Sequence, residues 1–259
     1  MKIFDIEAYF QSIYPSERSC PWDNDGLLVC ADREREVHSV LTCLDVTFTA
    51  IEKAIREGCE LIVSHHPLIF SPIKSVNEDS IVGQKVLLLI QNGISLISLH
   101  TRFDGAVGGL NEHFGKSLGL IPLNAPPILP DEPFIGAVGL LAKKLNPDEL
   151  ALRVADTVKA PVRLYSAGLS VEKVAFCCGA AQELVLPALE QGADAFIGGD
   201  ISYHIAQEAA ERGMTVVDCG HHASEKASPF LFCDALSAFS SKLKVIPFSE
   251  ATGGEFVGF

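Results

Sequence analysis

The sequence predicts an α/β protein, built from two α/β domains with mostly parallel sheets flanked by helices. Short apolar runs alternate with helix-like segments along almost the whole chain. These runs are apolar throughout, which is typical of parallel strands that are buried on both faces. The chain has 259 residues, of which 48% are hydrophobic. It is therefore long enough for one large domain or two smaller ones.

The expected elements repeat a strand–helix order. Strands are expected at 38–45, 60–64, 94–99, 134–141, 162–166, 173–178, 195–198, 215–219 and 244–248. Helices are expected at Phe48–Glu57, Ile81–Asn92, Pro147–Thr157, Glu183–Gln191, Ser202–Arg212 and Glu225–Lys242. The segments GCELIVSHH (58–66) and GADAFIGGD (192–200) resemble each other. Either a βαβ unit was duplicated, or both follow a pattern that is common to parallel α/β proteins.

A proline-rich segment divides the chain. Residues 121–133 hold five prolines and no periodicity, which favours a linker between two α/β units. We therefore expect a first domain over 1–125 and a second over 130–221.

Composition excludes several classes of protein. The net charge is −13 and the pI about 5.0, and an acidic surface repels nucleic acid and anionic lipid. The eight cysteines form no CxxC pair, and most lie in apolar runs, as Cys177 and Cys178 do. They are read as free, buried thiols. The amino terminus has no signal-peptide pattern, and no apolar run has the roughly 20 residues of a membrane helix. The expectation is a cytoplasmic protein.

Histidines gather where four of the predicted strands end. The sequences there are SHHP, LHTRFD, GGDISYH and CGHHASE. Ligands of open α/β sheets bind beyond the carboxyl ends of the strands. Six of the eight histidines lie in these four places: His65, His66, His100, His204, His221 and His222.

Three of these ends also place a histidine and a carboxylate four residues apart. The pairs are His100 with Asp104, Asp200 with His204, and His221 with Glu225. Imidazole and carboxylate together bind Zn²⁺, Fe²⁺, Mn²⁺, Co²⁺ or Ni²⁺. There are more donors than one tetrahedral ion uses, which favours two divalent ions. Ions roughly 3.5–4 Å apart can share a bridging hydroxide that attacks a phosphate, an amide or a ring carbon.

Structural readings of the same residues stay open. Adjacent histidines in a strand point to opposite faces, so His65 and His66 converge only if the chain leaves strand geometry before Pro67. Asp104 could be a helix N-cap, and Glu225 an acid favoured by a helix dipole. In WDNDGLL, the single tryptophan, Trp22, is read as a core residue, and Asn24, Asp25 and Gly26 are read as a turn.

Five motifs resemble one family over nearly the whole chain. They are PWDNDGLLV, SHHPLIF, LHTRFDGAVGGLNE, GGDISYH and DCGHHASE, in this order. The chain resembles the GTP cyclohydrolase I type 2 homologues, which are dinuclear-metal, NGG-interacting-factor-like proteins. It looks like the short form, without the inserted domain of some members.

The resemblance implies a set of site residues. It places His66 and Asp104 on one ion and His65 and His221 on the other, with Glu225 bridging. It places His100, Asp200 and His204 beside the metals as catalytic or proton-transfer residues. In this family Arg102 replaces a more common asparagine, and a guanidinium beside the metals would favour an anion.

The resemblance also implies architecture and function. The metals would lie in the cleft between the domains, residues 222–259 would complete the first domain, and the chains would form a homohexamer. We expect a dinuclear metal-dependent hydrolase that acts on a nucleotide or another small phosphorylated or cyclic-amide substrate through a metal-bridged hydroxide. The alternative is a non-catalytic metal-binding or regulatory protein that assembles as a ring. A metallopeptidase is disfavoured because the chain has no HExxH motif.

Overall fold

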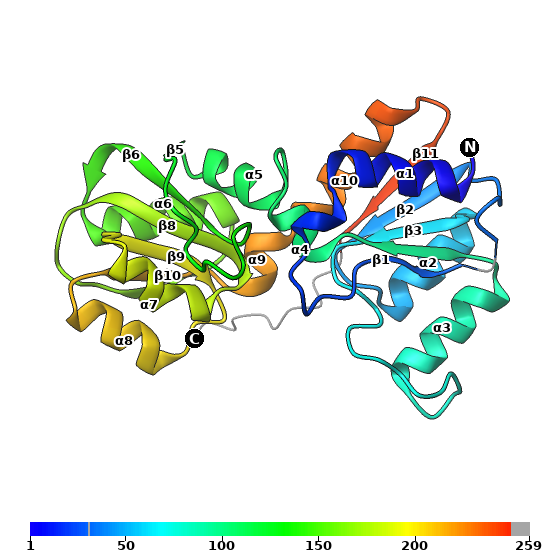
Figure 1. The fold of residues 1–259 in the computed structure, drawn as a ribbon, viewed down its shortest axis with the longest axis horizontal. Helices are drawn as coiled ribbons and strands as arrows, with labels where there is room; N and C mark the ends of the chain where they lie inside the picture. The colour runs from blue at the N-terminus through cyan, green and yellow to red at the C-terminus, as the bar shows by residue number, and fades with distance from the viewer. Residues whose placement is uncertain (31, 250–259) are drawn as a thin grey trace. The chain divides into compact units, whose positions relative to one another are not determined.

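The chain folds into two compact units. A computed structural model describes residues 1–30 and 32–249. One unit comprises Met1–Ala106 with the segment that starts at Lys226, and the other is Val107–Glu225 (Figure 1). Each unit has a sheet flanked by helices, which confirms the predicted α/β class. The domain limits 1–125 and 130–221, with 222–259 returning to the first domain, stay a prediction. Within the described residues, every helix is too short or too polar to cross a membrane.

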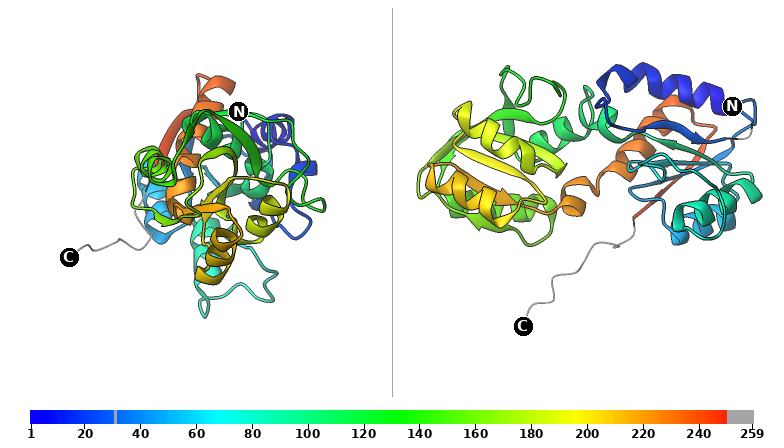
Figure 2. Two further views of the ribbon diagram at one scale, coloured as in Figure 1. Left: turned by 90° about the vertical axis from the view of Figure 1, so that its left-hand side faces the viewer. Right: turned by 60° about the horizontal axis from the view of Figure 1, so that its bottom comes forward.

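The first unit contains a five-stranded sheet in the order β1-β4-β3-β2-β11. β4, β3, β2 and β11 are parallel, and β1 joins antiparallel at one edge. Figure 2 shows that α10 and β11, from the end of the chain, lie with the elements of its beginning. The elements are α1 (Ile3–Ile13), a 3-10 turn (Ser16–Arg18), β1 (Gly26–Val29), β2 (Ser39–Cys43), α2 (Phe48–Glu57), β3 (Leu61–Ser64), α3 (Ile81–Gln91), β4 (Ser95–Ser98), α4 (His100–Asp104), α10 (Ser228–Phe239) and β11 (Lys244–Phe248).

Helices cover both faces of this sheet because its strands are apolar on both sides. Alternate strand residues such as Leu41 and Ile62 pack with Ile51 of α2 in one core cluster, which also includes residues of α3. Thr42, one position along β2, points to the other face, where its hydroxyl donates to the Pro229 carbonyl of α10 at 2.7 Å. The continuous apolar pattern thus predicted the layering correctly.

The second unit contains a six-stranded sheet in the order β5-β6-β8-β9-β10-β7. The pairings β8–β9 and β9–β10 are parallel, whereas β5–β6, β6–β8 and β10–β7 are antiparallel. This sheet is therefore mixed, with its parallel strands in the centre. The elements are α5 (Leu110–Ser117), β5 (Leu120–Pro122), β6 (Ala137–Leu145), α6 (Pro147–Val158), β7 (Arg163–Tyr165), β8 (Val171–Ala180), α7 (Gln182–Glu190), β9 (Ala195–Gly199), α8 (Tyr203–Glu211), β10 (Thr215–Asp218) and α9 (His221–Glu225).

Two local expectations were wrong. Ile121 and Pro122, placed in a linker, belong to β5 and pair with β6. The single helix expected over 225–242 is two helices, α9 and α10. Pro229 lies in the first turn of α10, where a missing N–H costs nothing, and it begins a new helix there.

Strand register brings the chemically important ends of the strands together. In the first sheet Cys43 is aligned with Ser64, and Ser64 with Ser98. In the second sheet Asp218 is aligned with Gly198. Residues that follow these positions therefore lie at the same edge of their sheet, where the parallel strands end.

An ion pair at the other end of the first sheet makes a testable contribution to stability. Glu57, at the end of α2, accepts hydrogen bonds from Lys244 of β11 and from Lys53, both at 2.8 Å. These lysines lower the pKa of Glu57 to about 2, from a usual 4.5. A carboxyl with a lowered pKa in the folded state stabilises the fold above about pH 4.5 and loses that effect as the pH falls towards 2.

We therefore expect the Glu57→Gln variant to be less stable than the wild type at pH 7 and to lose less stability on acidification to about pH 2. Urea unfolding at several pH values measures this difference. The matched control is Glu52→Gln on the same helix, where Glu52 lies 3.9 Å from Arg56. Parallel stability curves for the wild type and the Glu57 variant would contradict the prediction.

Candidate metal centre

In the first unit, the rings of His65 and His66 lie close together. β3 ends at Ser64, so both histidines lie outside the strand. Their backbone N–H groups donate to the carbonyls of Cys43 and Leu44 at 3.1 and 3.0 Å. The Ser64 hydroxyl donates to the His66 carbonyl at 2.8 Å and closes the turn. The two ring centroids are 4.9 Å apart, so the chain does leave strand geometry before Pro67, as predicted.

A third imidazole joins this pair. His100 begins α4, directly beyond the end of β4, and its ring centroid lies 5.4 Å from that of His65 and 5.7 Å from that of His66. One ring nitrogen of each of the three lies within 4.8 Å of the others. His65 is fully buried, and His66 and His100 are partly buried. This geometry can hold a metal ion.

Two aspartates orient these rings. The Nδ1 atom of His66 lies 2.8 Å from a carboxylate oxygen of Asp45, and Nδ1 of His100 lies 2.8 Å from one of Asp23. A carboxylate accepts a hydrogen bond, so each Nδ1 carries the proton and each Nε2 keeps a lone pair. Histidines that bind metals are commonly held in this way. The arrangement fits metal ligation through Nε2.

Asp23 is held as an anion inside the unit. Its side chain is fully buried. Its second oxygen accepts the Thr101 backbone N–H at 3.1 Å and the Thr101 hydroxyl at 2.5 Å. Burial raises the pKa of Asp23, but the hydrogen bonds and charge of His100 and the hydrogen bonds of Thr101 outweigh it and lower that pKa. The charged form is therefore stabilised where it fixes the His100 tautomer.

Asp104 lies at the end of the same short helix, α4. One of its oxygens is 3.7 Å from Nε2 of His65. Phe103, the residue before it, is fully buried and packs on Phe232 with ring centroids 4.6 Å apart. Core packing under α4 thus fixes a carboxylate beside the imidazole of His65. All four donors come from the carboxyl ends of β3 and β4.

The second unit repeats this chemistry at the ends of β9 and β10. Nδ1 of His221 lies 2.8 Å from an oxygen of Asp200, and Nε2 of His221 lies 3.0 Å from an oxygen of Glu225. Asp200 has a φ of +52°, a conformation that costs a non-glycine residue about 1–3 kcal/mol and that clusters at functional sites. Glu225 is 3% exposed. A nearly buried carboxylate beside an oriented imidazole can act as a second group of metal donors.

Gly179, near the end of β8, makes room for Glu225. A Cβ atom at this position would lie 2.2 Å from Oε1 of Glu225 and 3.6 Å from Nε2 of His221. The backbone N–H of Gly179 donates to the Ser224 hydroxyl at 3.0 Å, and that hydroxyl donates to the His221 carbonyl at 2.7 Å. Glycine is needed here both for this close approach and for a φ of +72°.

The remaining predicted residues lie in less clear positions. His204 is an exposed residue of α8, and its ring contacts that of Tyr203 at 5.2 Å. His222 follows His221 in α9 and is partly buried. Asp200, expected beside the metals, has an oxygen 2.8 Å from Nδ1 of His221, and its role in the reaction stays a prediction. The division of the ligands between two ions stays a prediction.

Sequence reasoning missed three residues. Asp45 and Gly179 carry no motif, and Asp23 lies in WDNDGLL but was given no role. Asp45 follows β2 in the same register as the histidines that follow β3. A search for acids at every predicted strand end would have found Asp45. Cys177 and Cys178 were expected to be buried strand residues, and they are 3% and 5% exposed.

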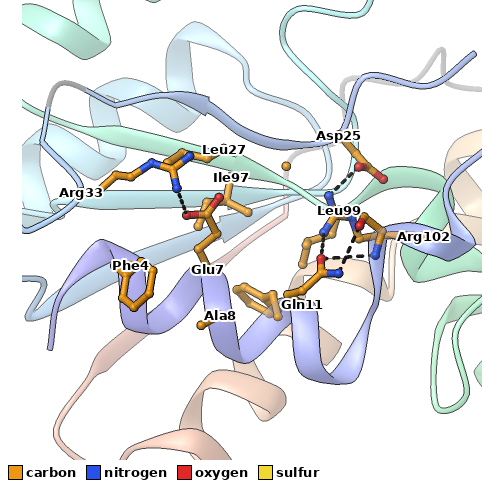
Figure 3. A pocket seen from close by; sticks show the side chains of 13 residues that line it. Phe4, Glu7, Ala8, Gln11, Asp25, Leu27, Arg33, Ile97, Leu99 and Arg102 are labelled. Atoms are coloured by element: carbon orange, nitrogen blue, oxygen red, sulfur yellow. Dashed lines mark hydrogen bonds and ion pairs between the residues drawn. The ribbon is translucent and has the colours of Figure 1, made fainter.

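Arg102 does not place a free positive charge beside the metals. It is 7% exposed, and its guanidinium donates to Asp25 at 2.6 Å and to Gln11 at 3.3 Å. Figure 3 shows these contacts in a pocket of about 470 Å³ beside α1. The pocket has an apolar wall that includes Leu27 and Ile97. The expectation that Arg102 favours an anion at the metals is not supported, because Asp25 already neutralises it.

Comparison with known proteins identifies the family of this chain. The sequence profile of the family described as Duf34/NIF3 (NGG1p interacting factor 3) matches residues 1–252. The chain belongs to the Duf34/NIF3 family. This Duf34/NIF3 chain is 34% identical over 230 residues to a Clostridium perfringens protein named "GTP cyclohydrolase 1 type 2 homolog", and 87% of each chain is covered.

Solved structures agree with the fold of this Duf34/NIF3 protein. Reduced HcgD from Methanocaldococcus jannaschii is 27% identical with a TM-score of 0.83, and 96% of this chain and 97% of that chain are covered. A Bacillus cereus protein related to NIF3 is 21% identical with a TM-score of 0.83, and 100% of this chain and 99% of that chain are covered. The latter likeness is one of fold alone.

Proposed function

We propose that this protein is a dinuclear metal-dependent hydrolase that acts on a nucleotide or another small phosphorylated or cyclic-amide substrate. The observation that carries the proposal is the shared orientation of His66, His100 and His221. Each has its Nδ1 atom on an aspartate at 2.8 Å, so that Nε2 is presented as a donor. Structural histidines have no need of such a uniform arrangement.

The proposed ligands are the five predicted from the sequence. They are His65, His66 and Asp104 of the first unit and His221 and Glu225 of the second. The donors are nitrogen and oxygen without thiolate, which suits Zn, Fe, Mn, Co or Ni. Two such ions, when bound, supply Lewis-acid polarisation of the substrate and activation of water.

The protein's own groups would move protons and hold the site in place. Asp23 keeps the proton on Nδ1 of His100, so Nε2 of His100 can accept a proton from water or return one to a leaving group. His204 is the second candidate for this role. The names of relatives, which include "GTP cyclohydrolase 1 type 2" in Helicobacter pylori, support a nucleotide substrate. Assembly as a homohexamer, proposed from the resemblance, stays a prediction.

A hydrolysis screen with a ligand variant tests the proposal. The protein is reconstituted with each of the five metals and assayed on nucleotides, phosphoesters and small cyclic amides. We expect His65→Ala to lower turnover at least about a hundredfold, because metal catalysis supplies several kcal/mol. The matched control is His38→Ala, since His38 is an exposed histidine of the same unit.

The alternative is a non-catalytic metal-binding or regulatory protein. It shares the donor set but needs no proton-transfer residue. If the wild type binds metal and no compound is turned over in a His65-dependent way with any of the five metals, the hydrolase proposal is abandoned in favour of this alternative.

A further inference from the structure

Two exposed aromatic side chains lie against the outer edge of His100. Trp22 is 52% exposed and Phe70 is 51% exposed. Their ring centroids are 6.0 Å apart, and each lies 6.2 Å from that of His100 in an edge-to-face arrangement. Trp22, expected in the core, therefore lies at the surface beside a candidate metal donor.

Hydrogen bonds, and not burial, hold Trp22 in place. Cys20 donates its backbone N–H to the Thr101 hydroxyl at 2.9 Å, and Asp23 accepts from His100 and Thr101. The chain before and after Trp22 is thus hydrogen-bonded to the first residues of α4. A half-exposed indole gains only part of the free energy of burial that a core tryptophan gains, yet its backbone position is fixed.

The segment that carries Phe70 is attached to the same loop. The side-chain amide of Asn24 donates to the carbonyl of Ile69, the residue before Phe70. The two rings therefore belong to one preorganised surface. Preorganisation reduces the ordering cost when a ligand binds.

We propose that Trp22 provides the stacking face, and Phe70 the flank, for a planar heteroaromatic ring of the substrate. This inference rests on the proposed function, whose substrate class it narrows to compounds with a purine-like or similar flat ring. Stacking of a base on an aromatic side chain is sequence-tolerant and worth about 1–3 kcal/mol. The surface would hold the ring while the donors at His65, His66 and His100 face the part of the substrate that reacts.

The sole tryptophan makes the test direct. Trp22 is the one tryptophan of the chain, so its fluorescence reports ring binding at this position without any turnover. The protein, treated with a chelator to remove metals, is titrated with GMP and with ribose 5-phosphate, which has the sugar phosphate without the ring. We expect GMP to quench the fluorescence and ribose 5-phosphate at equal concentration to leave it unchanged. Equal quenching by both compounds would overturn the proposal.

Variants separate stacking from other roles. We expect Phe70→Ala to raise the Kd for GMP about tenfold in calorimetry, and Trp22→Phe to raise it less than Trp22→Ala. The matched control is Phe4→Ala, because Phe4 is 52% exposed on α1 of the same unit and is expected to leave the Kd unchanged. If the variants change the oligomer size on gel filtration and leave GMP affinity unchanged, the surface serves assembly and the proposal is wrong.

The two proposals fail separately. Ring binding without any metal-dependent turnover would support the stacking surface and refute the hydrolase. His65-dependent turnover with equal rates for ring-containing and ring-free substrates would support the hydrolase and refute the stacking surface.

Discussion

Replacing Gly179 by alanine is expected to remove most of the metal affinity of the second unit and to destabilise the protein. The new Cβ would lie 2.2 Å from Oε1 of Glu225, so the carboxylate must leave its position. The φ of +72° adds a backbone cost of about 1–2 kcal/mol. We expect metal affinity to fall at least about tenfold, measured by competition with a chromogenic chelator.

Gly168 offers a matched control for this substitution. It has the same φ of +72° in the same unit, and a Cβ there would meet nothing within 4 Å. Gly168→Ala is expected to lower the free energy of unfolding by about 1–2 kcal/mol and to leave metal affinity unchanged. If both variants lose metal equally, backbone strain and not the displacement of Glu225 is responsible.

Replacing Asp23 by asparagine is expected to lower turnover by the metal-loaded protein about 10- to 100-fold, the usual effect of losing a carboxylate that orients a histidine of a metal site. One oxygen of Asp23 accepts from His100, and the other accepts twice from Thr101. An asparagine side chain has one acceptor oxygen, so it can accept either from His100 or from Thr101 in this way, and not from both. If its NH₂ faces His100, Nδ1 becomes an acceptor and the proton moves to Nε2, which then cannot accept a proton from water.

Turnover assays of the Asp23→Asn variant, with NMR of the histidine rings, measure both the loss of activity and the tautomer of His100. The control is Glu60→Gln, because Glu60 accepts the backbone N–H groups of His38 and Ser39 at 3.1 and 2.9 Å in the same unit. Glu60→Gln should lower stability and leave turnover by the folded protein intact. Unchanged turnover in Asp23→Asn would mean that His100 does not transfer protons in the reaction.

The sequence predicted most of the strands, because a period of hydrophobicity is a local property, but it did not predict β1, β5 or the antiparallel pairings of the second sheet. α2 begins and ends as expected at Phe48–Glu57, between the Thr47 cap and Gly58. β11 was expected at 244–248 and spans Lys244–Phe248. The polar residues at the strand ends could also be found without a structure, since a buried apolar run that stops at His65 or His221 is visible in the sequence.

The partners of those residues could not be predicted in the same way. Asp23 and His100 are 77 positions apart, and their contact depends on how the segment before β1 packs against α4. Gly179 has an ordinary place near the end of a strand until Glu225 is located beside it. Tryptophan is a large apolar residue that is commonly buried, and only tertiary packing leaves Trp22 half exposed.

The two junctions between the units lie next to proposed metal ligands in the sequence. Within the described residues the second unit is one continuous segment inserted into the first. The insertion begins three residues after Asp104 and ends at Glu225, so both junctions adjoin a proposed metal ligand. A residue gained or lost at either junction would change the connection that follows a donor, because α4 ends at Asp104 and α9 ends at Glu225. Connections between two units usually tolerate insertions and deletions, but selection for metal binding would remove that tolerance here.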